Sequence, residues 1–288
     1  MNQIGEKTEL LALLKLLDDP DPEIFSQVEG KVLEIGSTAL PYLETAFRRS
    51  KDQLSNNRIK TILDKIQFNK TSAALYNWKT KTDQNLIEGS LILASFHYPE
   101  LSIAEVQQKI SKLKQDVWLE LNEEFTALEK IHILNHVFFK IYNFRGNKTN
   151  LSQPQNSLIN DLLDKRQGNS VILSILYLEI AQSLKLPVYG VNLPENFILA
   201  YLNSGQLSSD SNALFYINPF NDGVVFTKDD IDVFVKQLEL EPDKKYFQPC
   251  HNEAALKRLM NELLNAYELA GDYDKGDDMK NLLKVLKG

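Results

Sequence analysis

The strongest constraint on the fold is an apolar stretch in the second half of the chain. Residues 171–184, VILSILYLEIAQSL, are hydrophobic on nearly every side of a helix rather than along one stripe. Such a helix must be covered all round, so we expect it to be buried. It contains Glu179 and is too short to cross a bilayer, so we interpret it as the centre of a water-soluble fold.

Three strand-like runs follow this helix, and each is bounded by Pro, Gly or Asn. They are Val188 to Leu193, Phe197 to Leu202 and Leu214 to Asn218. Residues 203–212 are polar and predict a turn between the last two runs. A buried helix followed by consecutive strands predicts an α+β fold, mostly helical, in which the helix packs on a small antiparallel sheet.

The first 70 residues predict short helices. Asp21 followed by Pro22 is typical of a helix start, and Gly36 of a helix end. Short helices with short connections favour an antiparallel stack. The stretches 14–23 and 33–43 resemble a HEAT-type repeat, but they make up about one and a half repeats, too few for a free-standing solenoid.

The remaining regions complete the predicted organisation. Residues 71–145 predict helices near 84–96, 103–114 and 127–144, whereas residues 146–165 lack periodicity and predict a loop. The tail is similar to a TPR-like helical hairpin. We therefore expect a HEAT-like module at 1–70, a core at 71–250 with its helix and sheet at 160–235, and a closing hairpin at 251–288.

Charge and cysteine content exclude several classes of protein. The chain has 32 Lys and Arg against 39 Asp and Glu, a net charge of −7, which argues against nonspecific nucleic-acid binding. Cys250 is the single cysteine, so neither an intrachain disulfide nor a CxxC zinc site can form. The N-terminus does not resemble a signal peptide. We expect a cytoplasmic protein that does not associate with a membrane and binds neither a metal nor a cofactor.

The start of the apolar helix is where chemistry is expected. Gly168, Asn169 and Ser170 precede it. A helix N-terminus presents unpaired N–H groups, which stabilise a thiolate or an oxyanion. Papain-like and transglutaminase-like folds place their nucleophile at such a position, the base on the next strand and an orienting group on the strand after that.

Several motifs around this helix resemble the SirB family of transglutaminase-like proteins. The specific ones lie within 161–223: DKRQGN at 164–169, LSILYLEIA at 173–181, LPVYGVNLP at 186–194, and NPFNDG at 218–223. Weaker matches at 86–101 and 138–147 extend the resemblance over about residues 84–288. The resemblance implies a transglutaminase-like core.

The resemblance also implies three catalytic positions, and this chain departs from the active pattern at each. Cysteine is expected at Ser170, histidine at Asn196 and aspartate at Asn218. Asparagine cannot accept a proton at neutral pH, and a serine hydroxyl without a base is a weak nucleophile. Loss of a general base costs about 10²–10⁴-fold in rate. We therefore expect no catalytic residue here.

The same residues can have either a purely structural role or a role in binding. Ser170 can be a helix cap, and Asn196 and Asn218 can satisfy the backbone at strand ends. Alternatively, a remodelled polar cleft could hydrogen-bond a neutral ligand or peptide. Its candidate residues are Asn169, Ser170, Asn192, Asn196, Asn218 and Asn221, with Lys165 and Arg166 as a possible anion site.

Other candidate residues carry weaker signals. His132 and His136 have a metal-sharing spacing, but no third ligand is visible, so we interpret them as structural. Cys250 precedes a helix, yet lies outside the motifs. His97 is interpreted as a core or turn residue. The acidic run that begins at Asp229 predicts a helix N-terminus.

The sequence supports three hypotheses. The first is a non-catalytic pseudoenzyme that binds a protein or peptide, since helical modules of this kind bind proteins. The second is a hydrolase or acyltransferase with a rebuilt site that uses Ser170 or Cys250. It needs a base from outside the motif, drawn from His132, His136, Glu195 or Asp222. The third is a purely structural or dimerisation role.

Overall fold

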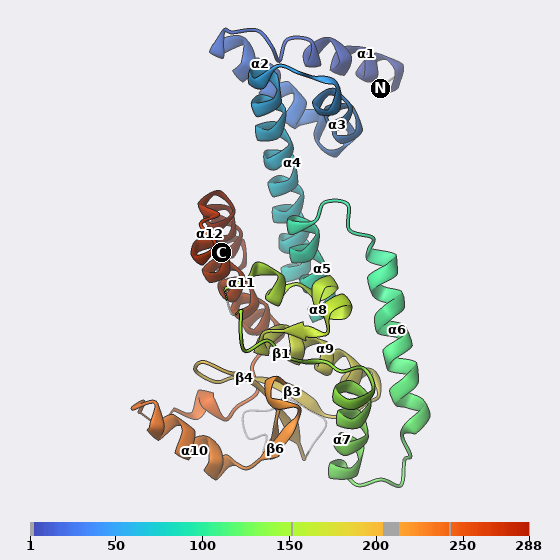
Figure 1. Ribbon diagram of the computed structural model, residues 1–288, viewed down its shortest axis with the longest axis vertical. Coiled ribbons are helices and arrows are strands. Elements are labelled where there is room, and N and C mark those ends of the chain that lie inside the picture. Colours follow the sequence, from blue (N-terminus) through green and yellow to red (C-terminus); the bar gives the residue numbers. More distant parts are fainter. Residues whose placement is uncertain (1–2, 151, 204–212, 242, 288) are drawn as a thin grey trace. The chain divides into compact units, whose positions relative to one another are not determined.

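The computed structural model describes residues 3–150, 152–203, 213–241 and 243–287 (Figure 1). The chain divides into two compact units, Met1–Ala74 and Leu75–Gly288. The division falls inside the long helix α4 (Gln53–Thr80).

The smaller unit is helical and has a core of its own. It contains α1 (Gln3–Leu14), α2 (Pro22–Ile35), the 3-10 turn η1 (Gly36–Ala39), α3 (Leu40–Arg49) and the first part of α4. As predicted, Asp21 caps α2, because its carboxylate accepts the N–H of Glu23 at 2.8 Å, and Gly36 ends α2 with φ 64°. The buried core includes Leu10, Leu17, Val28, Val32, Leu43, Ile59 and Ile62.

The larger unit opens with helices that begin at capping side chains. They are α5 (Leu86–His97), α6 (Ile103–Glu120) and α7 (Ala127–Asn135), which continues into the π-helical turn η2 (His136–Ile141). The Asn85 side chain accepts the N–H of Glu88 at 2.9 Å, and Thr126 forms a capping box with Glu129. These caps explain why the helices start where they do.

The segment 146–165 is not the loop that the sequence predicts. Strand β1 (Arg145–Gly146) pairs in parallel with β2 (Gln167–Gly168), and η3 (Pro154–Ser157) and α8 (Ile159–Lys165) lie between them. Helix α8 is only seven residues long and packs against α5, α6 and α9. Its regularity comes from contacts with distant parts of the chain, which a local hydrophobic pattern does not contain.

Helix α9 (Ser170–Ser183) is the buried centre of this unit, as predicted. Every residue from Val171 to Leu178 is at most 2% exposed. The antiparallel sheet beside it has the order β3 (Val188–Asn192), β4 (Phe197–Leu202), β5 (Ala213–Asn218) and β6 (Val224–Phe226). Alternate side chains of a strand point to opposite faces, and β4 is buried on both.

Two helical layers cover the sheet. Helix α9 packs against β3 and β4, while α10 (Lys228–Gln237) packs on the other face, with Ile231 and Val235 against Ile198 and Ala200. Asp229 lies in the first turn of α10, as its acidic run predicts. Short 3-10 turns lie at η4 (Pro219–Asn221) and η5 (Lys244–Tyr246).

The C-terminal helices form a hairpin that is integrated into the larger unit. Helix α11 (Asn252–Leu269) packs against α5, α9, β3 and α12 (Tyr273–Lys287). The polar turn predicted at 203–212 lies outside the described residues except for Asn203. Within the described ranges, the helices lack the length and apolar character needed to cross a membrane.

His97 joins α5 to α11. Its Nδ1 lies 2.7 Å from the hydroxyl of Tyr267, and the two rings stack with centroids 5.7 Å apart. Burial, together with the positive charge of Lys275, lowers the pKa of His97 from 6.5 to about 4, although Asp161 and Asp272 act in the opposite direction. The imidazole is therefore neutral at physiological pH.

Acid should weaken the fold through His97. Between pH 6.5 and about 4 the unfolded chain takes up a proton at His97 that the folded chain does not, so stability falls as pH falls through this window. We expect the free energy of unfolding to fall by about 1–2 kcal/mol across this window. This is less than the full 1.36 kcal/mol for each unit of pKa difference, because water screens the charge on a partly buried ring. Urea unfolding of the wild type and of His97→Gln at several pH values in this window tests the prediction. It would be contradicted if the free energy of unfolding had the same pH dependence in both proteins.

Candidate functional site

Asn169 fixes the start of α9. Its side-chain oxygen accepts the N–H of Ile172 at 2.9 Å, and its side-chain nitrogen donates to the hydroxyl of Ser157 at 2.8 Å. Its own N–H donates to the carbonyl of Asn156 at 2.8 Å. Both ends of the amide are occupied, so Asn169 serves the helix start and has little left to offer a ligand.

Ser170 is the first residue of α9 and is 9% exposed. Its hydroxyl oxygen accepts the backbone N–H of Phe197, the first residue of β4, at 3.3 Å. The chain thus brings Ser170 beside Phe197, the residue that follows Asn196. Among the described residues, no histidine or carboxylate hydrogen-bonds the Ser170 hydroxyl.

Asn196 and Asn218 have different local roles. The N–H of Asn196 donates to the carbonyl of Pro194 at 2.7 Å, and its half-buried side chain makes no hydrogen bond within the described ranges. The side-chain oxygen of Asn218 accepts the N–H groups of Phe220 and Asn221 at 3.1 and 3.3 Å. Asn218 therefore holds the η4 corner, and its amide oxygen is not free to orient a base.

Two glycines allow the η4 corner to pack closely. A Cβ on Gly146 would lie 2.6 Å from both the ring and the carbonyl of Phe220. Gly223 has φ +71°, its N–H donates to the carbonyl of Asn218 at 2.9 Å, and its carbonyl accepts the side chain of Asn135 at 2.8 Å. A side chain at either glycine would displace a neighbour of the η4 corner: Phe220 in the case of Gly146, and Asn135 in the case of Gly223.

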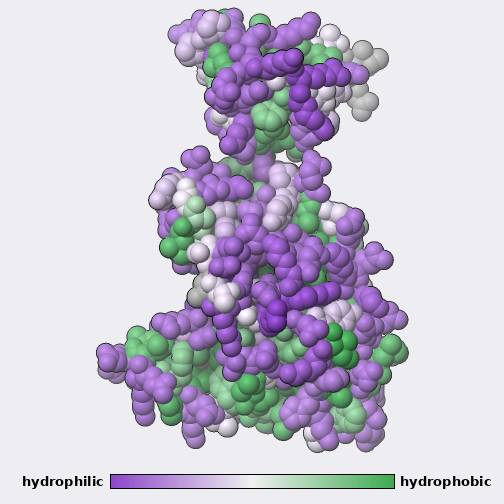
Figure 2. Space-filling model, in the orientation of Figure 1, coloured by the Kyte–Doolittle hydropathy of each residue, from purple (hydrophilic) through white to green (hydrophobic). Residues whose placement is uncertain are grey.

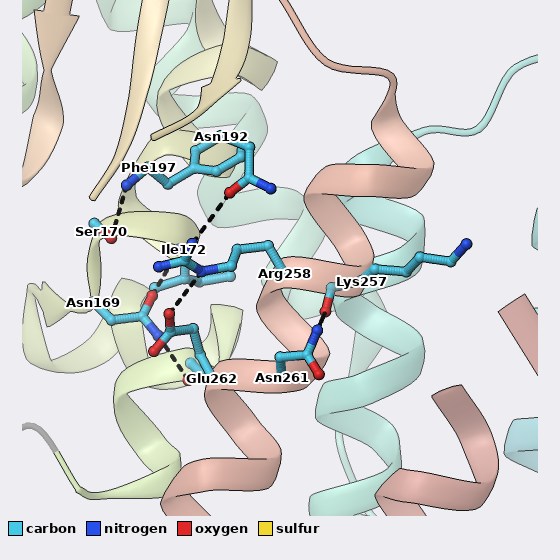
Figure 3. A network of polar contacts seen from close by, with 10 residues as sticks. Asn169, Ser170, Ile172, Asn192, Phe197, Lys257, Arg258, Asn261 and Glu262 are labelled. Carbon is cyan, nitrogen blue, oxygen red and sulfur yellow. Dashed lines mark hydrogen bonds and ion pairs between the residues drawn. The ribbon is translucent and has the colours of Figure 1, made fainter. Parts of the chain in front are cut away.

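A charged pair from α11 reaches the end of β3, close to Ser170 and Phe197 (Figure 3). Arg258 donates to the side-chain oxygen of Asn192 at 3.2 Å and to Glu262 at 2.8 Å. Asn192 is the register partner of Phe197, so the arginine and Ser170 hold adjacent strands at the loop that carries Asn196. Sequence reasoning missed Arg258, whose four-residue spacing from Glu262 signals a helical ion pair and not its contact with β3.

The remaining predicted cleft residues lie elsewhere or are already engaged. Lys165 pairs with Asp161 at 2.6 Å within α8. The guanidinium of Arg166 lies over the rings of Tyr142 and Phe144, 5.3 and 4.8 Å from their centroids. These contacts leave no obvious anion site in the pair, whereas Asn221 is exposed at the η4 corner.

The other candidate bases are not gathered at Ser170. His132 and His136 are exposed on α7 and η2. Glu195 and Asp222 are exposed and adopt left-handed backbone angles, φ 59° and 51°. None of the four hydrogen-bonds Ser170 or Cys250 in the part of the chain that the structure describes. In that same part, no three His, Cys, Asp or Glu side chains are grouped closely enough to hold a metal ion.

Cys250 is a half-buried residue beside Gly190 of β3. Its N–H donates to the carbonyl of Gly190 at 2.8 Å, and its sulfur would lie 3.7 Å from a Cβ on that glycine. Burial raises the pKa of Cys250 to about 11. Because the thiolate is the reactive form, this environment is unfavourable for a nucleophile.

The native chain should therefore resist thiol reagents. A pKa near 11 instead of 9 lowers the thiolate fraction near neutral pH by about 100-fold. We expect iodoacetamide to modify Cys250 at least about 100-fold more slowly in the native protein than in denaturant, with Cys250→Ser as the unlabelled control. Mass spectrometry of timed samples measures both rates, and native modification within tenfold of the denatured rate would refute this.

Comparison with known proteins identifies the larger unit. Residues 104–261 match the family model of the transglutaminase-like superfamily, a range that includes Ser170, Asn196, Asn218 and Arg258. A UPF0162 protein of Xylella fastidiosa (strain 9a5c) is 25% identical over 201 residues, 66% of this chain and 67% of that protein. A UPF0162 protein of Vibrio cholerae is 26% identical over 140 residues, 49% and 50% of the two chains.

A shorter similarity extends to a different kind of protein. Human F-box only protein 21 is 28% identical over 105 residues, 36% of this chain and 17% of that protein. The chain spans between half and two thirds of the two UPF0162 proteins described above. No solved structure matches the sequence. Because the family model covers more than half of the residues, the chain belongs to the transglutaminase-like superfamily.

Proposed function

We propose that this chain is a non-catalytic transglutaminase-like protein of the SirB type that binds a protein or peptide. The observation that carries the proposal is the environment of Ser170, whose hydroxyl oxygen is hydrogen-bonded by a backbone N–H at 3.3 Å. A serine in this position needs an adjacent base to act as a nucleophile. Asn196 and Asn218, which stand where the resemblance implies a histidine and an aspartate, cannot take up its proton at neutral pH.

The same residues favour binding to a peptide. The Asn196 side chain makes no hydrogen bond within the described residues, so both its donor and its acceptor remain for a ligand. An amide group matches the N–H and C=O groups of an extended backbone. In this proposal, Asn196 holds a peptide segment beside Ser170 without cleaving it.

The surface and the smaller unit offer further contact area. Figure 2 shows a mostly hydrophilic face on which hydrophobic side chains gather over the sheet and α10. Val224 on β6 and Val233 on α10 are 49% and 55% exposed. The HEAT-like module of the proposal, residues 1–70, belongs to the class of helical units that bind proteins. The match to part of F-box only protein 21 supports a module that also occurs within a longer chain.

The alternative hydrolase or acyltransferase lacks a supporting observation. It needs a base near Ser170 or an activated Cys250. No carboxylate or histidine hydrogen-bonds Ser170 in the described residues, and burial raises the pKa of Cys250 to about 11.

Affinity capture with the full chain tests the binding role. We expect wild-type protein to recover a defined partner, and Asn196→Trp, which replaces the amide with a bulky indole, to lower recovery by about tenfold or more. Gln115→Trp, at an exposed position of α6, is the matched control and should leave recovery unchanged. Circular dichroism confirms that both variants fold. Absence of any reproducible partner, or equal recovery by Asn196→Trp, would remove the proposal.

A further inference from the structure

A cavity of about 550 Å³ opens at the end of α9 opposite Ser170. Its walls come from the 82–84 loop between α4 and α5, the 185–187 loop after α9, and the start of α11 at His251 and Asn252. Gln182, which also lines it, lies about 18 Å from Ser170 along the helix axis. Pockets of about 300–1,000 Å³ hold small molecules, and nothing in the proposed function uses this one.

Three side-chain amides in the walls have orientations that their hydrogen bonds determine. Their nitrogens donate to backbone carbonyls: Gln84 to Lys79 at 2.8 Å, Gln182 to Val188 at 2.9 Å, and Asn252 to Gln84 at 3.0 Å. Because a carbonyl only accepts, the NH₂ group of each amide must face it. The three amide oxygens accept no hydrogen bond from the described residues, so the walls offer acceptors to a ligand that donates.

Two opposite charges lie on different walls of the same cavity. Asp83 belongs to the 82–84 loop, and Lys185 follows α9. Both are exposed, and among the described residues neither forms an ion pair with the other or with a third group. His251 lines the cavity as well. A ligand between the walls would meet an anion on one side and a cation on the other.

We propose that this cavity binds a small zwitterion of the α-amino-acid type, either a free amino acid or a dipeptide. Its ammonium group donates to the amide oxygens and to Asp83, and its carboxylate accepts from Lys185 and His251. Leu186 and Pro187 supply apolar surface for a side chain. A simple anion would leave Asp83 unmatched and a simple cation would leave Lys185 unmatched, so the pair of charges favours the zwitterion.

Isothermal titration calorimetry with the full chain tests this. The probes are the proteinogenic L-amino acids and glycyl dipeptides, and each probe that binds is compared with its N-acetyl and methyl ester derivatives. We expect at least one probe to bind with one-to-one stoichiometry. Blocking either charge of that probe should weaken binding by about tenfold or more, the effect of 1.4 kcal/mol. Asp83→Asn and Lys185→Met should each have an effect of the same size.

Matched variants distinguish the cavity from general charge effects. Asp229→Asn and Lys236→Met change exposed charges on α10, which does not line the cavity, and should leave affinity unchanged. The proposal is overturned if no probe binds at about 10 mM, where even weak ligands saturate. It is equally overturned if the blocked derivatives bind as well as the zwitterion, or if the α10 variants weaken binding as much as those at Asp83 and Lys185.

Discussion

Gly223→Ala should destabilise the larger unit by at least about 3 kcal/mol, because it combines strain with a steric clash. Gly223 has φ +71°, and a Cβ there would lie 2.3 Å from the side-chain oxygen of Asn135 and 2.5 Å from the ring of Phe139. That oxygen also accepts the hydroxyl of the fully buried Tyr177 at 2.8 Å. Displacing Asn135 would leave a buried hydroxyl unpaired, which by itself costs about 1–3 kcal/mol.

Gly271→Ala is the matched control for this prediction. Gly271 has a similar backbone angle, φ +76°, but a Cβ there would meet nothing within 4 Å. Its alanine variant should show only the cost of a left-handed backbone, about 1–2 kcal/mol. Urea unfolding of both variants measures the difference. Equal losses of stability would show that the Asn135 contact does not determine the corner that carries Asn218.

Ser170→Cys should create a thiol that reacts at least about 100-fold faster with iodoacetamide near neutral pH than the native Cys250 does. The introduced sulfur would lie at the first position of α9, where the helix N-terminus stabilises a negative charge. The N–H of Phe197, which donates to the serine oxygen, would donate to the thiolate. Cys250 also lies just before a helix, α11, but burial raises its pKa to about 11.

Ser174→Cys is the control for the helix end. Ser174 lies one turn further along α9, is fully buried and donates to the carbonyl of Phe197 at 3.2 Å. The pH dependence of alkylation reports each thiol pKa. We expect a midpoint below about 8 for position 170 and a much higher one for position 174. A midpoint at position 170 equal to or above that of a free thiol would mean that α9 does not present a nucleophile position.

The elements that could be predicted from the sequence are those whose signal lies within one continuous run of residues. The apolar run at 171–184 predicts a buried helix because no other arrangement covers all of its faces, and the run at 197–202 coincides with β4. The proximity of Ser170 to position 196 could be expected only through the resemblance. Hydrophobic periodicity contains no information on which strand end meets which helix end.

The parts that could not be predicted depend on distant contacts. Helix α8 has seven residues and β6 has three, so neither carries a clear period. Arg258 lies 66 positions from Asn192 and meets it only because α11 packs along β3. The cavity at the end of α9 combines three separate stretches of chain. Such features arise from tertiary packing and become visible only in three dimensions.

The claim that Ser170 is not a nucleophile is tested most directly by the rates at which wild-type protein and Ser170→Ala hydrolyse activated esters and glutamine amides. We expect equal rates, both at the level of buffer, because no histidine or carboxylate among the described residues hydrogen-bonds the Ser170 hydroxyl. A wild-type rate about tenfold or more above that of Ser170→Ala would contradict it and establish Ser170 as a nucleophile served by a base that the fold brings from elsewhere.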